Sequence, residues 1–180
     1  MDHKSIRVTR NPVLENLSFD ANSGALDYNG IRYMLIRPET VVEIQRVIEE
    51  KFGAEAAHEI FYRSGFRGTS LTAKKLLGSG LSPEKCLEAM FKMGSHLGWG
   101  NFKLLKTDRK IGVIEVTISA SPFAEAYGPS EQPVCAILCG ALAGIFSILK
   151  GKDYKCTEIG CVALEHGHCH FILKPITNSP

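Results

Sequence analysis

The first half of the chain carries apolar residues at helical spacing. Pro38 suits the first position of a helix, where its missing N–H group costs no hydrogen bond. Apolar side chains then recur every three or four residues over 41–61. The segment SGFRGTS, residues 64–70, is expected to interrupt this pattern before a short helix over 71–77. The Ser-Pro pair at 82–83 predicts the start of a further helix.

The hydrophobic period changes from about 3.6 residues to 2 after that helix. NFKLLK (101–106) and IGVIEVTIS (111–119) predict paired strands, and SPFAEAYGPSEQ (121–132) predicts a loop. An apolar helix is expected from Pro133 to about Gly151, followed by a final pair of strands. The whole pattern predicts an α+β fold in which an antiparallel sheet packs with helices.

A hairpin and a domain boundary are expected near the N-terminus. ALDYNGIRYMLI (25–36) turns at Asn29-Gly30, a pair that suits the positive φ angles of a type I′ turn. Residues 1–22 have weak periodicity and are expected to form an arm. Residues 23–176 are then expected to form one domain, since the chain is long enough for a single sizeable core.

Charge and composition argue against several classes of protein. The net charge of +2 is too small to indicate direct binding to nucleic acid or to a membrane surface. The uncharged run at 132–149 is interrupted by glycines and a proline, so a buried helix is expected there and no membrane span. Six cysteines without a visible secretion signal indicate a reducing compartment, and we expect a cytoplasmic protein.

The stretch CTEIGCVALEHGHCHF, residues 156–171, holds many side chains that bind metal ions. In a strand that begins at Cys169, that cysteine shares a face with Phe171, while His168 and His170 point to the opposite face. Because Phe171 marks the buried face, the two histidines are expected to face solvent. The metal ligands are therefore expected among the other side chains of the stretch.

Glu158, Cys161 and Cys169 are the candidate ligands in this stretch, because Gly160 can bend the strand and a turn can return the chain to Cys161. A closed zinc site needs a fourth ligand. Cys135 suits that role, since the positive end of a helix favours its thiolate, but Cys139 lies one turn further on and is a rival. Cysteines also serve as small apolar core residues, so simple packing is the alternative to a metal site.

Three segments resemble the 4-vinyl reductase domain family, also described as a hydrocarbon-binding domain: GWGNF (98–102), SASPFAEAYGPSEQPVCAILCGALAGIFS (119–147) and the stretch at 156–171. The resemblance extends from about Asn29 to Leu173. The family includes sensor domains of aromatic-responsive transcriptional activators. The resemblance implies a fold related to haem nitric-oxide sensors and vesicle-tethering subunits, and it implies a homodimer.

The resemblance also implies a set of zinc (Zn²⁺) ligands. Family sensors bind zinc through a Cys, a Glu and two further Cys, and the matching positions form the spacing Cys-x22-Glu-x2-Cys-x7-Cys: Cys135, Glu158, Cys161 and Cys169. Such a site has no open position, so its zinc would be structural. No role follows for the three remaining thiols, Cys86, Cys139 and Cys156.

Function is expected to come from a pocket for a small apolar or aromatic ligand, which the resemblance places between helices and sheet. The residues that we expect to line it lie where the helix before the sheet ends: Trp99, Phe102, Phe91, Met90 and His96. Ordinary core packing is the alternative for each residue.

The expected function is a small-molecule sensor or carrier domain. The alternatives are a reductase of tetrapyrrole vinyl groups or its accessory protein, and a homodimeric assembly adaptor. The absence of a dinucleotide or iron–sulfur motif argues against an enzyme, and we expect no catalytic residues.

Overall fold

The computed structural model describes residues 10–28, 30–108 and 110–177. The described residues fall into two compact units, which meet in the sequence between Leu35 and Ile36. The hairpin at 25–33 groups with the first unit, so the expected domain over 23–176 stays a prediction. Across the described ranges, no helix is both long enough and apolar enough to cross a membrane.

The first unit is a small antiparallel sheet preceded by one helical turn. The helix α1 (Pro12–Glu15) is followed by the strands β1 (Ser18–Asp20), β2 (Ala25–Tyr28) and β3 (Ile31–Tyr33), which lie in the order β1-β2-β3. The pairing of β2 with β3 confirms the hairpin, although Asn29 of its turn lies outside the described residues. The expected arm therefore contains α1 and β1.

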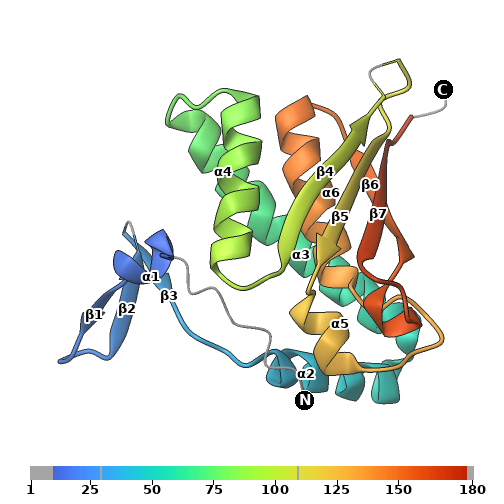
Figure 1. The fold of residues 1–180 in the computed structure, drawn as a ribbon, viewed down its shortest axis with the longest axis horizontal. Coiled ribbons are helices and arrows are strands. Elements are labelled where there is room, and N and C mark those ends of the chain that lie inside the picture. The colour runs from blue at the N-terminus through green and yellow to red at the C-terminus, as the bar shows by residue number, and fades with distance from the viewer. Residues whose placement is uncertain (1–9, 29, 109, 178–180) are drawn as a thin grey trace. The chain divides into compact units, whose positions relative to one another are not determined.

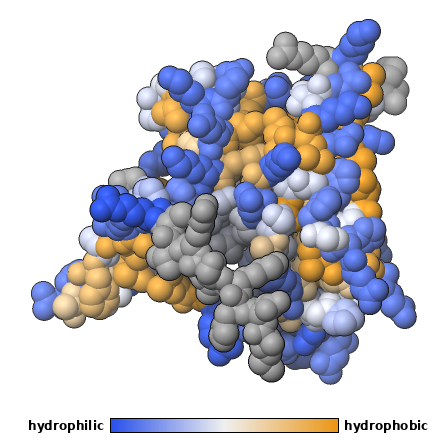
Figure 2. All heavy atoms as spheres, in the orientation of Figure 1, coloured by the Kyte–Doolittle hydropathy of each residue, from blue (hydrophilic) through white to orange (hydrophobic). Residues whose placement is uncertain are grey.

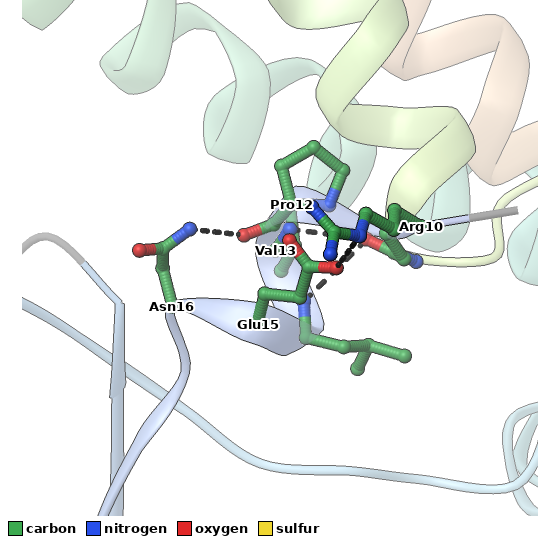
Figure 3. Close-up of polar contacts among 7 residues, drawn as sticks. Arg10, Pro12, Val13, Glu15 and Asn16 are labelled. Carbon is green, nitrogen blue, oxygen red and sulfur yellow. Dashed lines mark hydrogen bonds and ion pairs between the residues drawn. The ribbon is translucent and has the colours of Figure 1, made fainter.

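Polar contacts hold the single turn of α1 together (Figure 3). The Asn11 side chain accepts a hydrogen bond from the Val13 N–H at 3.0 Å, which satisfies a free donor at the helix start. The Asn16 side chain donates to the Pro12 carbonyl at 2.8 Å. Arg10 pairs with Glu15 at 3.7 Å, but this pair is exposed and adds little stability.

The second unit packs helices against a four-stranded antiparallel sheet. The sheet has the order β4-β5-β7-β6, and Figure 1 shows its strands side by side, with α4 beside β4 and α6 behind the sheet. This arrangement confirms the α+β fold class. The elements of the unit are α2 (Pro38–Phe52), α3 (Ala54–Gly78), α4 (Pro83–His96), β4 (Asn101–Thr107), β5 (Ile114–Ser119), α5 (Pro122–Tyr127), α6 (Ala136–Lys150), β6 (Tyr154–Gly160), the 3-10 turn η1 (Val162–Leu164) and β7 (Cys169–Pro175).

Helix α6 is the centre of the core, because it packs between the sheet and α3. Its small residues allow α3 to come very close. A Cβ atom added at Gly140 would lie 1.8 Å from the Tyr62 carbonyl oxygen, and one at Gly144 would lie 2.4 Å from the Phe66 carbonyl oxygen. The Thr69 hydroxyl of α3 also donates a hydrogen bond to the Ala141 carbonyl of α6 at 2.8 Å. The small residues over 140–144 therefore allow close packing of α6 against α3 within the same chain.

Two predictions of non-helical segments, at 64–70 and at 121–132, are wrong. Helix α3 runs through the segment at 64–70, because Gly65 lies against the Ile137 carbonyl on α6 and tertiary packing offsets the low helix propensity of glycine. The predicted loop at 121–132 contains α5. Ser121 caps α5 by accepting a hydrogen bond from the Ala124 N–H, and Pro122 occupies its first turn.

The surface of the second unit mixes polar and apolar side chains. Leu104 and Leu105 on the edge strand β4 are 41% and 45% exposed, and Lys103 and Lys106 lie beside them. Figure 2 shows such a mixture, with hydrophobic residues visible between hydrophilic ones. Lysines and the bulge between Leu104 and Lys106 protect this sheet edge from pairing with other strands.

Candidate metal centre

Four side chains from distant parts of the sequence meet at one end of the sheet. Cys135 is the residue that precedes α6, Glu158 lies on β6, Cys161 follows β6, and Cys169 begins β7. Their candidate ligand atoms all lie within 4.8 Å of one another. The register between β6 and β7 shifts between Glu158 and Gly160, so the expected strand irregularity is present and the chain turns toward the cluster. These four residues are referred to below as the Cys3Glu cluster.

The distances between the thiols fit one tetrahedral metal ion. The Sγ atoms of Cys135 and Cys161 are 4.0 Å apart, those of Cys135 and Cys169 are 3.6 Å apart, and those of Cys161 and Cys169 are 3.9 Å apart. A tetrahedral zinc ion with Zn–S bonds of about 2.3 Å requires sulfur atoms about 3.8 Å apart. The three thiols therefore lie close to the positions that the ion needs.

Glu158 completes the cluster and has one oxygen without a protein partner. Its Oε2 atom accepts a hydrogen bond from the Cys135 N–H at 2.9 Å, which orients the carboxylate. Its Oε1 atom is buried and has no hydrogen-bond partner among the described residues. A buried carboxylate oxygen without a partner is costly, and a cation would supply the missing contact.

The pKa values of the four groups in the cluster are shifted in different directions. The pKa of Cys161 is lowered because Cys135 and then Cys169 donate hydrogen bonds to its sulfur. The pKa of Cys135 is raised well above its usual range, because it donates to Cys161 and then because of Cys169 and burial. Burial and the neighbouring Cys161 thiolate raise the pKa of Glu158 to about 8. Cys161 is therefore the group that ionises first.

Cys169 keeps its proton in the metal-free cluster. The hydrogen bond from Cys135 lowers the pKa of Cys169, but its own donation to Cys161 and its burial outweigh that effect and raise the pKa overall. At neutral pH the cluster thus holds one thiolate and three protonated groups. A divalent cation would displace those protons.

His168 and His170 of the stretch lie outside the cluster. Cys169, Phe171 and Leu173 are fully buried, whereas His168 is exposed. His170 is partly buried and lies 3.5 Å from Glu115 on β5. Strand alternation therefore separates His170 from the cluster as predicted, but the expectation that His170 faces solvent is wrong, because its Nε2 atom is buried.

The remaining cysteines lie in the core outside the cluster. Cys139 is buried on α6, and its contact with Cys156 adds to the burial that raises the pKa of Cys156. Cys86 packs with Ala73 and Met90 in a separate apolar group. The structure thus selects Cys135 over Cys139 for the cluster, because Cys135 stands before the first regular turn of α6.

The five residues expected to line a ligand pocket fall into different groups. Phe91 and Phe102 are in contact, with ring centroids 5.3 Å apart. Trp99 packs edge-on against Phe123, with ring centroids 5.4 Å apart. Phe91 also packs edge-on against Phe146 of α6, with ring centroids 6.4 Å apart. The five residues therefore include one ring pair, and Trp99 pairs with a ring outside the five.

Met90 and His96 are both on α4, and Phe91 packs against the apolar group that contains Met90. Met90 belongs to the apolar group of Cys86, and partly buried His96 ends α4. Sequence reasoning missed Phe123, which the Ser-Pro start of α5 at 121–122 would have placed on a helix.

Two family models match the chain. Residues 114–175 match the 4-vinyl reductase domain, and residues 13–99 match the family described as activator of aromatic catabolism. The phenol regulator MopR of Acinetobacter guillouiae is 24% identical over 177 residues. That match covers 92% of this chain and 31% of MopR, so the chain spans about a third of that relative. These matches confirm the resemblance to the 4-vinyl reductase family and to sensors of aromatic compounds.

Solved structures support the same assignment of fold. The phenol-responsive sensory domain of the transcription activator PoxR, solved with phenol, is 25% identical with a TM-score of 0.78, and the match covers 91% of this chain and 87% of that one. A vinyl-4-reductase family protein from Methanocaldococcus jannaschii is 17% identical with a TM-score of 0.57, and the match covers 81% and 84% of the two chains.

The expected fold relatives are also similar in structure. A trafficking protein particle complex subunit 3 from Naegleria fowleri has a TM-score of 0.54 at 12% identity, over 78% of this chain and 95% of that one. An H-NOX protein from S. oneidensis has a TM-score of 0.54 at 10% identity, over 84% and 82% of the two chains. Both likenesses concern the fold alone.

Proposed function

We propose that this chain is a sensor domain for a small aromatic molecule, held in shape by one structural zinc ion. The similarity to the PoxR sensory domain carries the proposal of a sensor, because it covers nearly all of both chains and that domain responds to phenol. The geometry of the Cys3Glu cluster supports the metal. A homodimer and a cytoplasmic location are further parts of the proposal.

The zinc ion would be held by Cys135, Glu158, Cys161 and Cys169. Four protein ligands fill a tetrahedral site, so no position is left for a reacting water. The ion would neutralise the buried carboxylate and thiolates, and it would tie the start of α6 to β6 and β7. Its contribution is therefore expected to be stability of the domain that holds the ligand.

Zinc binding is expected to release about three protons per ion at pH 7. The cluster has four ligands, and one of them, Cys161, is already ionised, which leaves three groups that must lose protons. Above pH 8 the release should fall to about two, because Glu158 then ionises before the metal binds. Calorimetric titration with zinc in two buffers of different ionisation enthalpy measures this number. Release of one proton or fewer at pH 7 would contradict the proposed ligand set.

The aromatic ligand is proposed to bind beside Trp99, near Phe91 and Phe102. Pockets for such ligands are lined mainly by apolar and aromatic side chains. Trp99 and Phe102 are only partly buried, and both pack against the main core between α4 and the sheet. His96 and Met90 are the other proposed lining residues, with His96 as the group that could hydrogen-bond a phenolic hydroxyl.

Titration with phenol is expected to change the emission of Trp99 in a saturable manner. Trp99 is the single tryptophan, so Trp99→Phe should remove this change. Phe91→Ala should weaken binding by about 1–3 kcal/mol, because a buried aromatic contact is lost. Phe52→Ala is the matched control, since Phe52 is 70% exposed at the end of α2. Equal affinity of the Phe91 and Phe52 variants would place the ligand elsewhere.

No specific observation favours the two alternative functions. The vinyl-4-reductase family protein is 17% identical, a likeness that concerns fold and carries no activity. The tethering subunit is 12% identical, and the same limit applies to an adaptor role.

The homodimer that forms part of the main proposal would need exposed apolar surface. Ile44 and Val47 on α2 offer such surface.

A further inference from the structure

A cavity of about 530 Å³ lies between α2, the start of α3 and the loop that leads to Cys135. It is separate from the proposed aromatic site, since its walls come from other residues. Gln45 and Glu49 of α2, Ala54 and His58 of α3, and Tyr127 of α5 form one side. The loop over 129–134 forms the other side. Figure 1 shows α2 and α5 together at one end of the second unit.

The carboxylate of Glu49 is held in a fixed orientation at this cavity. Its Oε1 atom accepts a hydrogen bond from the Gln45 amide at 2.9 Å, and its Oε2 atom accepts one from the Tyr127 hydroxyl at 2.8 Å. Gln45 is only 7% exposed, so this support is built into the packed side of α2. A carboxylate oxygen can accept more than one hydrogen bond, so both atoms can still receive a ligand donor.

The charge of the cavity favours a cation. Its ionisable lining residues are Glu49, His58, Tyr127 and Glu131. The nearby Arg46 is already engaged, since it pairs with Glu43 at 2.9 Å and donates to the Tyr127 carbonyl at 2.7 Å.

The remaining walls of the cavity are largely apolar and would accept the body of a small molecule. They are formed by Ala54, Pro129, Pro133, Val134 and Ala136.

We propose that this cavity binds a small primary amine with an apolar or aromatic body, whose ammonium group donates hydrogen bonds to Glu49. Ammonium–carboxylate hydrogen bonds are stronger than neutral ones, and they select for charge. Val134 and Ala136 flank Cys135, so an amine in the cavity would contact the segment that carries a member of the Cys3Glu cluster. The site would give the domain a second ligand class besides the aromatic molecule proposed at Trp99.

Three probes of the same size and different charge test the proposal: benzylamine, benzyl alcohol and benzoate. Calorimetric titration of the zinc-loaded chain, with the proposed aromatic site already saturated by phenol, should show saturable binding of benzylamine alone, with a dissociation constant on the order of 1 mM for so small a ligand. Glu49→Gln keeps the shape and should weaken benzylamine binding about tenfold or more. Glu88→Gln, at an exposed position on α4, is the control and should leave the affinity unchanged.

A second variant keeps the test decisive if Glu49→Gln disturbs folding. Ala54 is exposed at the first residue of α3, so Ala54→Leu should be tolerated and should narrow the cavity, weakening benzylamine binding. Trp99→Phe should bind benzylamine as the unaltered chain does, which separates this site from the aromatic one. Equal binding of the three probes, no saturation by benzylamine, or unchanged affinity in both cavity variants would overturn the proposal.

Discussion

Cys161→Ser is expected to abolish metal binding and to lower the free energy of unfolding by about 3–5 kcal/mol, the scale of breaking a buried charged contact. The substitution would remove the thiolate that ionises first and leave three ligands, so the proposed zinc ion would no longer be held. Cys135→Ser and Cys169→Ser should act in the same way, because metal binding and folding are coupled. Metal analysis together with urea unfolding of each variant measures both effects.

The controls for this prediction are variants outside the Cys3Glu cluster. Cys86→Ser places a hydroxyl in an apolar group and should cost about 1–3 kcal/mol of stability while retaining the metal. His168→Ala should retain both the metal and the stability, since His168 is exposed and precedes β7. His170→Ala should also retain the metal, because His170 lies beside Glu115. A full equivalent of metal in Cys161→Ser, or its loss in Cys86→Ser, would show that the ligand set is wrong.

Gly140→Ala is expected to destabilise the second unit by about 3 kcal/mol or more. The added Cβ atom would meet the Tyr62 carbonyl oxygen at 1.8 Å, so α3 and α6 would have to move apart along their closest contact. Overpacking of a core usually costs about 1–3 kcal/mol, and here the opposing atom is backbone that cannot rotate away. Urea unfolding of the variant and of the unaltered chain provides the comparison.

Gly68→Ala is the matched control for the same helix pair. Gly68 lies inside α3, and a Cβ atom added there meets nothing within 4 Å. Alanine is the better helix former, so this variant should be neutral or more stable by up to about 1 kcal/mol. If both glycine variants unfolded at the same urea concentration, the close packing of α3 against α6 would not be a source of stability.

Local periodicity predicted the parts of the site that depend on local structure. Alternation along β7 places Cys169 and Phe171 inside and His170 on the other face, and this holds because neighbouring strands fix the faces. The choice between Cys135 and Cys139 stayed open on physical grounds, because it depends on where α6 begins. The structure begins α6 at Ala136 and leaves Cys135 beside Glu158.

Tertiary contacts decided what periodicity could not. Gly65 and Gly68 read as a break in a helix, yet the fit of Gly65 against α6 allows α3 to continue through them. The cavity beside Glu49 also has no local signature, since its walls come from α2, α3, α5 and a loop. The ring contacts of the expected pocket residues were only partly predicted, because Trp99 packs against Phe123 of α5 and Phe91 packs against Phe146 of α6.

Native mass spectrometry tests the central proposal, a zinc-stabilised sensor for a small aromatic molecule, most directly, because one spectrum reads metal, ligand and copy number. The protein should be purified without added metal and measured with increasing phenol. We expect one zinc ion per chain and a saturable adduct of one phenol per chain that needs more phenol to form in Phe91→Ala. A folded chain that carries neither zinc nor phenol at any concentration would contradict the account.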